Sequence, residues 1–66
     1  NLPYENTVQR VLVDSYDERE GKTVYNGRTL TGKLVHFTSD EECIGRFVNV
    51  KINKANAFDL IGEISK

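Results

Sequence analysis

Residues 46–54 alternate between apolar and polar side chains. The β-branched residues Val48, Val50 and Ile52 alternate with the polar residues Asn49, Lys51 and Asn53. Because successive side chains of a strand point to opposite faces, this segment has one apolar face and one polar, partly basic face. A helix would scatter the same apolar residues around its circumference. The segment therefore predicts a half-buried β-strand, and its polar face is a natural place for a binding function.

Four other segments have the composition of strands or of short strand pieces. They are residues 7–16, residues 23–25, residues 33–37 and residues 59–64. Asn26-Gly27 indicates either a tight turn or a glycine bulge within a continuing strand. Gly62 lies in the middle of the last strand, where it weakens pairing unless another backbone or a ligand comes close, or the strand bends. Residues 17–22 are predicted to form a charged loop.

One segment, residues 38–45, predicts a short helical turn. Ser39 can cap it, acidic residues follow in the first turn, and Gly45 can end it. We expect Ile44 to pack into the core below it. Five short strands and no βαβ spacing indicate an all-β fold, a small five-stranded barrel of the oligonucleotide-binding (OB) type. An SH3-like barrel is the nearest alternative.

The length of 66 residues allows one domain with a small core. Among the aromatic residues, Phe37 and Phe58 are expected in that core, whereas the parity of Phe47 sets it opposite Val48. Residues 1–6 are expected to be extended, with Leu2 and Tyr4 available to pack against a neighbouring domain. The chain begins with Asn rather than Met, which suggests a single domain, with a core at residues 7–64, excised from a larger enzyme.

Catalytic and metal-binding patterns are weak in this sequence. His36 and Cys43 are the only histidine and cysteine, and no flanking pattern indicates a nucleophile–base pair. A lone cysteine forms no internal disulfide, so we interpret Cys43 as a small, partly buried residue. Asp40-Glu41-Glu42 are adjacent rather than spaced as in a calcium loop. We therefore predict a non-catalytic domain with no metal and no cofactor of its own.

No apolar run approaches the ~20 residues of a membrane span, and no signal peptide is visible. We expect a cytoplasmic domain that contacts no membrane and is monomeric in isolation.

The charges are unevenly distributed along a chain whose net charge is −1. Residues 1–20 hold five acidic and two basic residues, a net −3, and residues 27–55 hold five basic and three acidic residues, a net +2. Phosphate neutralisation by bulk charge is therefore weak, but a local basic face is possible. Cations for phosphates, rings for stacking and amides for base edges, the groups that hold single-stranded nucleic acid, all occur in the second stretch, but their spacing alone does not favour this ligand. The plain alternative is an ordinary solvent-facing sheet.

Several short motifs in order resemble a TRAM domain. They are Arg10-Val11-Leu12-Val13, Gly27-Arg28-Thr29, Lys33-Leu34-Val35-His36-Phe37, the run from Ile44 to Ile52, and Leu60-Ile61-Gly62-Glu63-Ile64. The likeness covers residues ~7 to 64 and is greatest to the C-terminal domain of the radical-SAM tRNA methylthiotransferases of the 2-methylthio-N6-isopentenyladenosine type. It implies an OB-like barrel that binds RNA.

By this resemblance, the domain grips the tRNA anticodon arm and helps to position an adenosine for the catalytic domains of the parent chain. Iron–sulfur clusters and S-adenosylmethionine would belong to those domains. The RNA contacts carried over from the family are Arg28, Lys33, Arg46 and Lys51, with His36 as a stacking residue.

A related branch of the family modifies a ribosomal protein and has an acidic TRAM face. The acidic first third of this chain keeps a protein-docking function open as the alternative. The Lys33–Phe37 motif resembles the tRNA branch, and we favour tRNA on that resemblance rather than on charge.

Overall fold

The structure, a computed structural model, describes residues 4–65 and consists of five strands in one closed sheet. The strands are β1 (Val8–Arg19), β2 (Lys22–Thr29), β3 (Leu34–Thr38), β4 (Phe47–Ala55) and β5 (Asp59–Ile64). Their order around the barrel is β1-β2-β3-β5-β4, and β4 returns to β1. Every neighbouring pair is antiparallel except β3 and β5, which are parallel. The predicted all-β, OB-like fold is confirmed.

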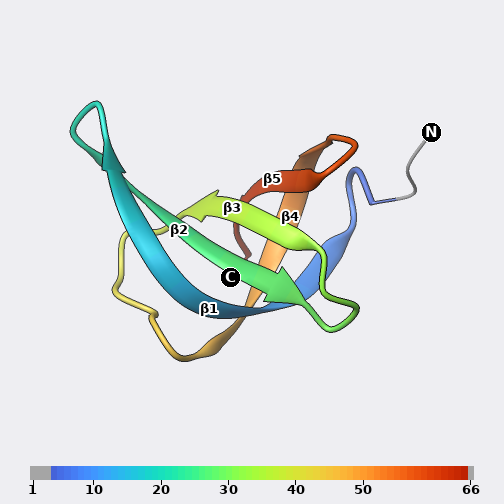
Figure 1. Ribbon diagram of the computed structural model, residues 1–66, viewed down its shortest axis with the longest axis horizontal. Helices are drawn as coiled ribbons and strands as arrows, with labels where there is room; N and C mark the ends of the chain where they lie inside the picture. The colour runs from blue at the N-terminus through green and yellow to red at the C-terminus, as the bar shows by residue number, and fades with distance from the viewer. Residues whose placement is uncertain (1–3, 66) are drawn as a thin grey trace.

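Strand β1 closes the barrel because it is long enough to have two partners. Val8–Leu12 pairs with β4, and Val11–Arg19 pairs with β2. Figure 1 shows this strand curving along one side of the molecule from the β4 side to the far end of the β1–β2 hairpin. A closed sheet leaves no edge strand exposed for pairing with another chain.

Alternation along the strands places one set of side chains inside the barrel. The fully buried apolar residues are Val11, Val13, Val35, Phe37, Val50, Ile52 and Leu60. In the alternating segment at residues 46–54, Val50 and Ile52 are buried, Val48 is half-buried, and Asn49 and Lys51 are exposed. The predicted two-faced strand is therefore confirmed.

Two glycines are required where strands approach closely. A Cβ on Gly62 would overlap the carbonyl oxygen of Lys51 and lie 2.9 Å from Val50 Cγ1. A Cβ on Gly27 would overlap the carbonyl oxygen of Leu12. Gly62 thus occupies a place where another backbone comes close, as its mid-strand position indicated.

The Asn26-Gly27 pair is part of a continuous strand rather than a hairpin turn. Strand β2 runs through both residues, and the irregularity lies opposite them in β1, where Asp14 is the extra residue between Val13 and Ser15. A bulge of this kind increases the local bend of the strand that carries it. A second irregularity leaves Asn53 unpaired between Ile52 and Lys54 of β4.

The prediction of a charged loop at residues 17–22 is wrong for most of these residues. Strand β1 continues to Arg19 and β2 begins at Lys22, so the turn is only Glu20-Gly21. Both turn residues have positive φ, 52° and 79°, which is typical of a type I′ hairpin turn. Pairing with β2 keeps residues 17–19 in strand conformation although they are charged.

The helical turn predicted for residues 38–45 is also not formed. These residues form bends and one turn, and no helix is present within residues 4–65. Ser39 Oγ accepts a hydrogen bond from the Glu41 N–H at 3.1 Å, which is a local turn rather than a helix cap. Gly45, with φ 80°, does end this segment, and Ile44 packs against the core as expected.

Three further predictions concern single aromatic residues and the N-terminal segment. Phe37 is in the core, but Phe58 is 89% exposed in the β4–β5 loop, so its predicted burial is wrong. Residues 4–6 form a turn rather than an extended segment, and Tyr4 packs against the core of its own barrel. Leu2 lies outside the described residues.

Candidate nucleic-acid interface

The five predicted contact residues are distributed over two adjoining outer faces of the barrel. Arg28 and His36 point outward from β2 and β3, and Lys33 precedes β3. Lys51 points outward from β4, and Arg46 lies in the loop that leads into β4. Strand β5 separates β3 from β4, so Lys51 and His36 are not neighbours. The structure therefore brings Arg28, Lys33 and His36 together and leaves Lys51 and Arg46 on the other face.

The outward residues of β1 and β4 form a continuous surface, here called the β1–β4 face. Its members are Val8, Arg10, Leu12, Phe47, Asn49 and Lys51. The register pairs them directly: Val8 with Lys51, Arg10 with Asn49, and Leu12 with Phe47. Leu12 also pairs with Arg28 of β2 on its other side, so Arg28 borders this face. Directly opposed residues lie about 5 Å apart at Cβ.

A cation–π contact organises the centre of the β1–β4 face. The Arg10 guanidinium lies 5.1 Å from the centroid of the Phe47 ring, and the ring remains 50% exposed. The contact holds a planar cation and an aromatic ring in a fixed relative position at the surface. Arg10 can bond phosphate or stack on a base in this position.

No acidic residue belongs to the β1–β4 face as defined above. Glu63 of β5 lies beside it, since it pairs with Lys51, and it accepts a hydrogen bond from Asn53 Nδ2 at 3.3 Å. Arg46 lies immediately before Phe47, and its carbonyl oxygen accepts a hydrogen bond from the N–H of Val13. Arg10 thus contacts the exposed ring of Phe47, and Arg46 precedes that residue in the chain, on a molecule whose net charge is −1.

Arg28 and Lys33 are bonded to nearby loops rather than extended into solvent. Arg28 Nη1 donates to the Gly32 carbonyl oxygen at 3.3 Å. Lys33 Nζ donates to the Ala57 carbonyl oxygen at 3.1 Å, which joins the β2–β3 loop to the β4–β5 loop. Both contacts are exposed, so replacing the carbonyl acceptors by phosphate oxygens requires little free energy. The exposed Phe58 ring follows Ala57 in this loop.

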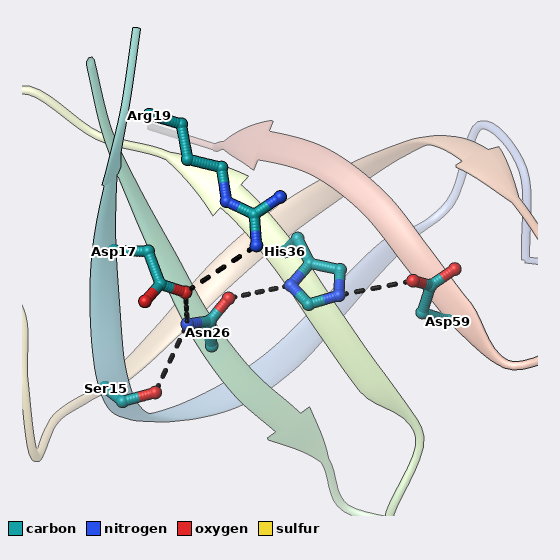
Figure 2. Close-up of polar contacts among 6 residues, drawn as sticks. All are labelled: Ser15, Asp17, Arg19, Asn26, His36 and Asp59. Atoms are coloured by element: carbon teal, nitrogen blue, oxygen red, sulfur yellow. Dashed lines mark hydrogen bonds and ion pairs between the residues drawn. The ribbon is translucent and has the colours of Figure 1, made fainter. Parts of the chain in front are cut away.

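His36 is held at both ring nitrogens. Its Nδ1 lies 2.7 Å from Asn26 Oδ1, and its Nε2 lies 3.2 Å from Asp59 Oδ2. Asn26 Nδ2 in turn donates to Ser15 Oγ and to Asp17 Oδ2. Figure 2 shows these side chains as a chain of contacts across β1, β2, β3 and β5. The ring edge is occupied, so only its faces are open to a base.

Cys43 and Tyr25 are the groups whose ionisation the fold perturbs. Burial raises the pKa of the Cys43 thiol, the Glu42 carboxylate adds to this, and Arg46 opposes it. Burial likewise raises the pKa of the Tyr25 hydroxyl. A raised thiol pKa disfavours the nucleophilic thiolate, which agrees with the interpretation of Cys43 as a structural residue.

Two further findings concern metals and membranes. Within residues 4–65, the structure shows no group of three or more His, Cys, Asp or Glu residues placed to hold a metal ion. The described part of the chain also contains no helix long and apolar enough to cross a membrane.

Sequence reasoning missed Arg10 and left Phe47 open. Arg10 lies in the acidic first third of the chain, outside the net basic stretch of residues 27–55 from which the contact residues were predicted. Its parity with Val8 and Leu12, opposite to Val11, was the signal that placed it outward. The contact of Arg10 with Phe47 requires the pairing of β1 with β4. Barrel closure creates this pairing, and no local sequence pattern predicts it.

The sequence model of the TRAM domain matches residues 3–65. Among curated proteins, the chain is 49% identical over 96% of its length to a tRNA-2-methylthio-N(6)-dimethylallyladenosine synthase of Clostridium botulinum (strain Langeland). It is 47% identical over 97% of its length to the protein of that name from Natranaerobius thermophilus, and 46% identical over its whole length to that from Clostridium beijerinckii. The chain spans 14% of the length of each relative. A family match over nearly all residues, on a closed five-stranded barrel, shows that the chain belongs to the TRAM domain family.

Proposed function

We propose that this chain is the RNA-binding accessory domain of a tRNA-modifying methylthiotransferase of the radical-SAM type. In this proposal it grips the anticodon arm and helps to position an adenosine for the catalytic domains of the parent chain. The methylthio-transfer chemistry, with its iron–sulfur clusters and S-adenosylmethionine, belongs to those domains and not to this barrel. The names of the relatives support the parent enzyme, since each is a tRNA-modifying synthase.

The observation that carries the RNA-binding proposal is the β1–β4 face. Arg10 and Lys51 lie on it, Arg28 and Arg46 border it, and the exposed ring of Phe47 lies among them. Phosphate contacts by arginine and lysine supply most of the affinity for a nucleic-acid backbone, and a surface ring adds stacking. Local gathering of cations compensates for the near-neutral charge of the whole chain.

Lys33 and His36 extend the proposed interface onto the adjoining outer face of β2 and β3. Lys33 would exchange the Ala57 carbonyl oxygen for a phosphate oxygen, and His36 would offer a ring face for stacking. An anticodon arm has both a paired stem and an unpaired loop, so two adjoining faces of different chemistry fit it.

The test is a chemical-shift titration of the 66-residue chain with an anticodon-arm RNA hairpin at two salt concentrations. We expect the largest shifts at Arg10, Phe47, Asn49 and Lys51, with affinity that falls as salt rises. The combined reversal Arg28→Glu, Lys33→Glu and Lys51→Glu should weaken binding by about a hundredfold or more. Retained affinity in this variant would reject the proposal.

The matched control is Lys22→Glu, which reverses an exposed cation at the end of the β1–β2 hairpin. Because Lys22 lies at the other end of β2 from Arg28 and outside the β1–β4 face, its reversal should weaken binding much less than reversal of Lys51 alone. Equal losses would mean that the RNA responds to net charge and not to a defined face.

A second candidate function rests on the acidic end of the same hairpin. Asp17, Glu18 and Glu20 are exposed there, whereas the cations of the β1–β4 face lie at the other end of β1. Such an end could dock a basic segment of a protein substrate. This function predicts binding to a basic peptide that disappears when the three residues are neutralised together, with no salt-dependent binding of the RNA hairpin.

A further inference from the structure

A cavity of about 340 Å³ opens on the outer side of β3 and β5, away from the β1–β4 face. Its lining residues are Arg19, Val24, His36, Phe37, Thr38, Asp59, Ile61 and Gly62. Ligand sites in proteins run from about 300 to 1,000 Å³. A space at the lower end of that range, open on one side, fits a single small planar group rather than a complete dinucleotide.

The floor of this cavity is mostly apolar. Register places Ile61 beside His36, and Val24 beside Thr38 in the next outward row. Ile61 is 40% exposed, so part of its side chain is open to a ligand in the cavity. Gly62 follows Ile61 in β5 and also lines the cavity.

One wall of the cavity is a rigid polar edge formed by His36 and Asp59. Asn26 Nδ2 donates to the Asp17 carboxylate, which only accepts, so Asn26 Oδ1 faces His36 and the His36 Nδ1–H donates to it. His36 Nε2 then lies 3.2 Å from Asp59 Oδ2. Asn26 thus holds the imidazole on one side, and the protonated ring donates its Nε2–H to the Asp59 carboxylate on the other (Figure 2).

Asp59 keeps hydrogen-bonding capacity in this arrangement. Its Oδ1 accepts a hydrogen bond from Asn56 Nδ2 at 3.0 Å, and its Oδ2 faces His36. Each carboxylate oxygen has two lone pairs, so each can accept one further N–H. A held carboxylate beside an apolar floor selects a flat group that carries an N–H or amino edge, and a carboxylate is an established acceptor for amino groups of bases.

A cation lies at the rim of the cavity. The Arg19 guanidinium is exposed and only loosely held by Asp17, with Nη2 to Oδ2 at 3.9 Å. Figure 2 shows it reaching from the end of β1 toward β3. Lys54 also faces outward beside Ile61, since the two residues are paired between β4 and β5. These cations can meet a phosphate attached to whatever group the cavity holds.

We propose that this cavity is a subsite for one unpaired nucleobase that carries an exocyclic amino group. The base lies on Val24 and Ile61, its amino edge donates to Asp59, and its phosphate meets Arg19. Adenine, guanine and cytosine have such an edge. Uracil has no amino group, and its one ring N–H lies between two carbonyl oxygens, which a carboxylate repels. The proposal rests on the RNA-binding function proposed above and adds where a loop base is read, a role separate from the phosphate contacts of the β1–β4 face.

The direct test is a chemical-shift titration of the 66-residue chain with four mononucleotides, AMP, GMP, CMP and UMP. We expect AMP, GMP and CMP to shift the signals of Val24, His36 and Ile61, with UMP at least about threefold weaker because it lacks the amino donor. Ribose 5-phosphate should leave these signals unchanged. Equal binding of all four nucleotides, shifts from ribose 5-phosphate alone, or no shifts at all would overturn the proposal.

Two substitutions separate the contributions of the polar edge and the floor. Asp59→Asn should remove the preference for amino-bearing bases, whereas Glu63→Gln, on the same strand and outside this cavity, should leave it intact. Ile61→Ala should weaken all four nucleotides by about threefold to tenfold, and Leu30→Ala, which also truncates an exposed aliphatic side chain, should not. Amide spectra of each variant confirm that the barrel is folded before the titration is interpreted.

Two further probes distinguish a wrong nucleobase-subsite proposal from a wrong proposal of RNA binding by the β1–β4 face. A hairpin with abasic loop positions should bind the β1–β4 face but leave Ile61 and His36 unshifted. If the intact hairpin does not bind at all, the mononucleotide titration still reports on the cavity. N-acetyltryptophanamide tests for a peptide ligand instead, and shifts as large as those from AMP would overturn the assignment to a nucleobase.

Discussion

Gly62 shows how one missing side chain keeps this barrel closed. The strand crossing at Gly62 brings the Lys51 carbonyl into the space that a Cβ would occupy. Gly27 has the same role between β2 and β1. Neither residue needs glycine for its backbone angles, since both lie in ordinary strand conformation, and the requirement is purely one of space.

Substitution Gly62→Ala should lower the free energy of unfolding by about 2–3 kcal/mol, the usual result of forcing extra atoms into a packed interior. Urea unfolding followed by circular dichroism measures this. The comparison is Gly32→Ala, where a Cβ meets nothing within 4 Å but φ is 89°, and where the cost of the left-handed conformation is about 1–2 kcal/mol. A Gly62→Ala protein as stable as the wild type would contradict the close approach.

Cys43 gives the fold a dependence on alkaline pH. Its thiol has a raised pKa in the folded state because it is buried beside Glu42. When the pKa of a group is higher in the folded state than in the unfolded state, its contribution to the free energy of unfolding is complete at pH values below the unfolded-state pKa. That contribution is lost as the pH rises through the folded-state pKa. The buried Tyr25 hydroxyl acts in the same direction at higher pH.

We therefore expect the urea midpoint of the wild-type chain to fall between pH 8 and pH 10.5. The variant Cys43→Ala should be less stable at pH 8 because it leaves a small cavity, but it should lose less stability over that interval. Thiol labelling of the folded wild type should also be slower than that of the urea-unfolded chain at the same pH. Equal loss in both proteins would show that Cys43 does not contribute.

At the scale of elements, the β1–β2 hairpin has one unfavourable residue at its turn. Glu20 has φ 52°, in a region that asparagine and glycine tolerate far better than glutamate. The register of twelve-residue β1 against β2 imposes this turn in spite of the residue that occupies it.

Glu20→Asn should stabilise the chain by about 0.5–1 kcal/mol, as expected when a residue suits its turn conformation. Thermal unfolding at pH 7 provides the measurement. Glu41→Asn removes the same charge at an exposed loop residue whose φ is not positive, and it should change the melting temperature little. A similar gain in both variants would attribute the effect to charge and not to the backbone.

The elements differ in how far their sequences determined them. Strands β4 and β5 follow local alternation, and their predicted bounds agree with the structure within one residue at each end. The extension of β1 through Asp17 and Glu18 was not predictable in this way, because it depends on pairing with β2. The capping signals at Ser39 and Gly45 are real local features, but five intervening residues without a second turn of apolar contacts do not sustain a helix.

The candidate site divides along the same line. Arg28, Lys33, Arg46 and Lys51 were predicted from residue type. Arg28 and Lys51 are exposed as strand parity predicts, whereas Lys33 and Arg46 precede their strands. The contact of Arg10 with Phe47 and the chain from Ser15 to Asp59 join residues from different strands. Such pairings follow from the strand order of the closed sheet, which a single sequence does not specify.

For the whole molecule, the arrangement of charge matters more than its sum. The β1–β2 hairpin end holds Asp17, Glu18 and Glu20 beside Arg19 and Lys22, a net charge of −1, whereas the cations of the β1–β4 face lie at the other end of β1. The molecule therefore has a charge asymmetry that can orient an approaching polyanion.

This asymmetry predicts a measurable salt slope in spite of the net charge of −1. If four cations contact phosphates, a plot of log affinity for the hairpin against log salt should have a slope of about −3. Arg10→Gln and Lys51→Gln should each make it shallower by about 0.7–0.9, and Lys22→Gln should not. Fluorescence anisotropy at three or more salt concentrations provides the slope, and a flat plot would contradict phosphate contact.

The return of β4 to β1 has a consequence for synthesis on the ribosome. Val8 finds its strand partner only when Lys51 is available, and β3 finds β5 only after residue 59. Half-made chains thus expose an unpaired β1 with Val8 and Leu12 on it, and topologies so rich in distant pairings fold slowly. The nascent barrel stays vulnerable to mispairing until almost its last residue has left the exit tunnel.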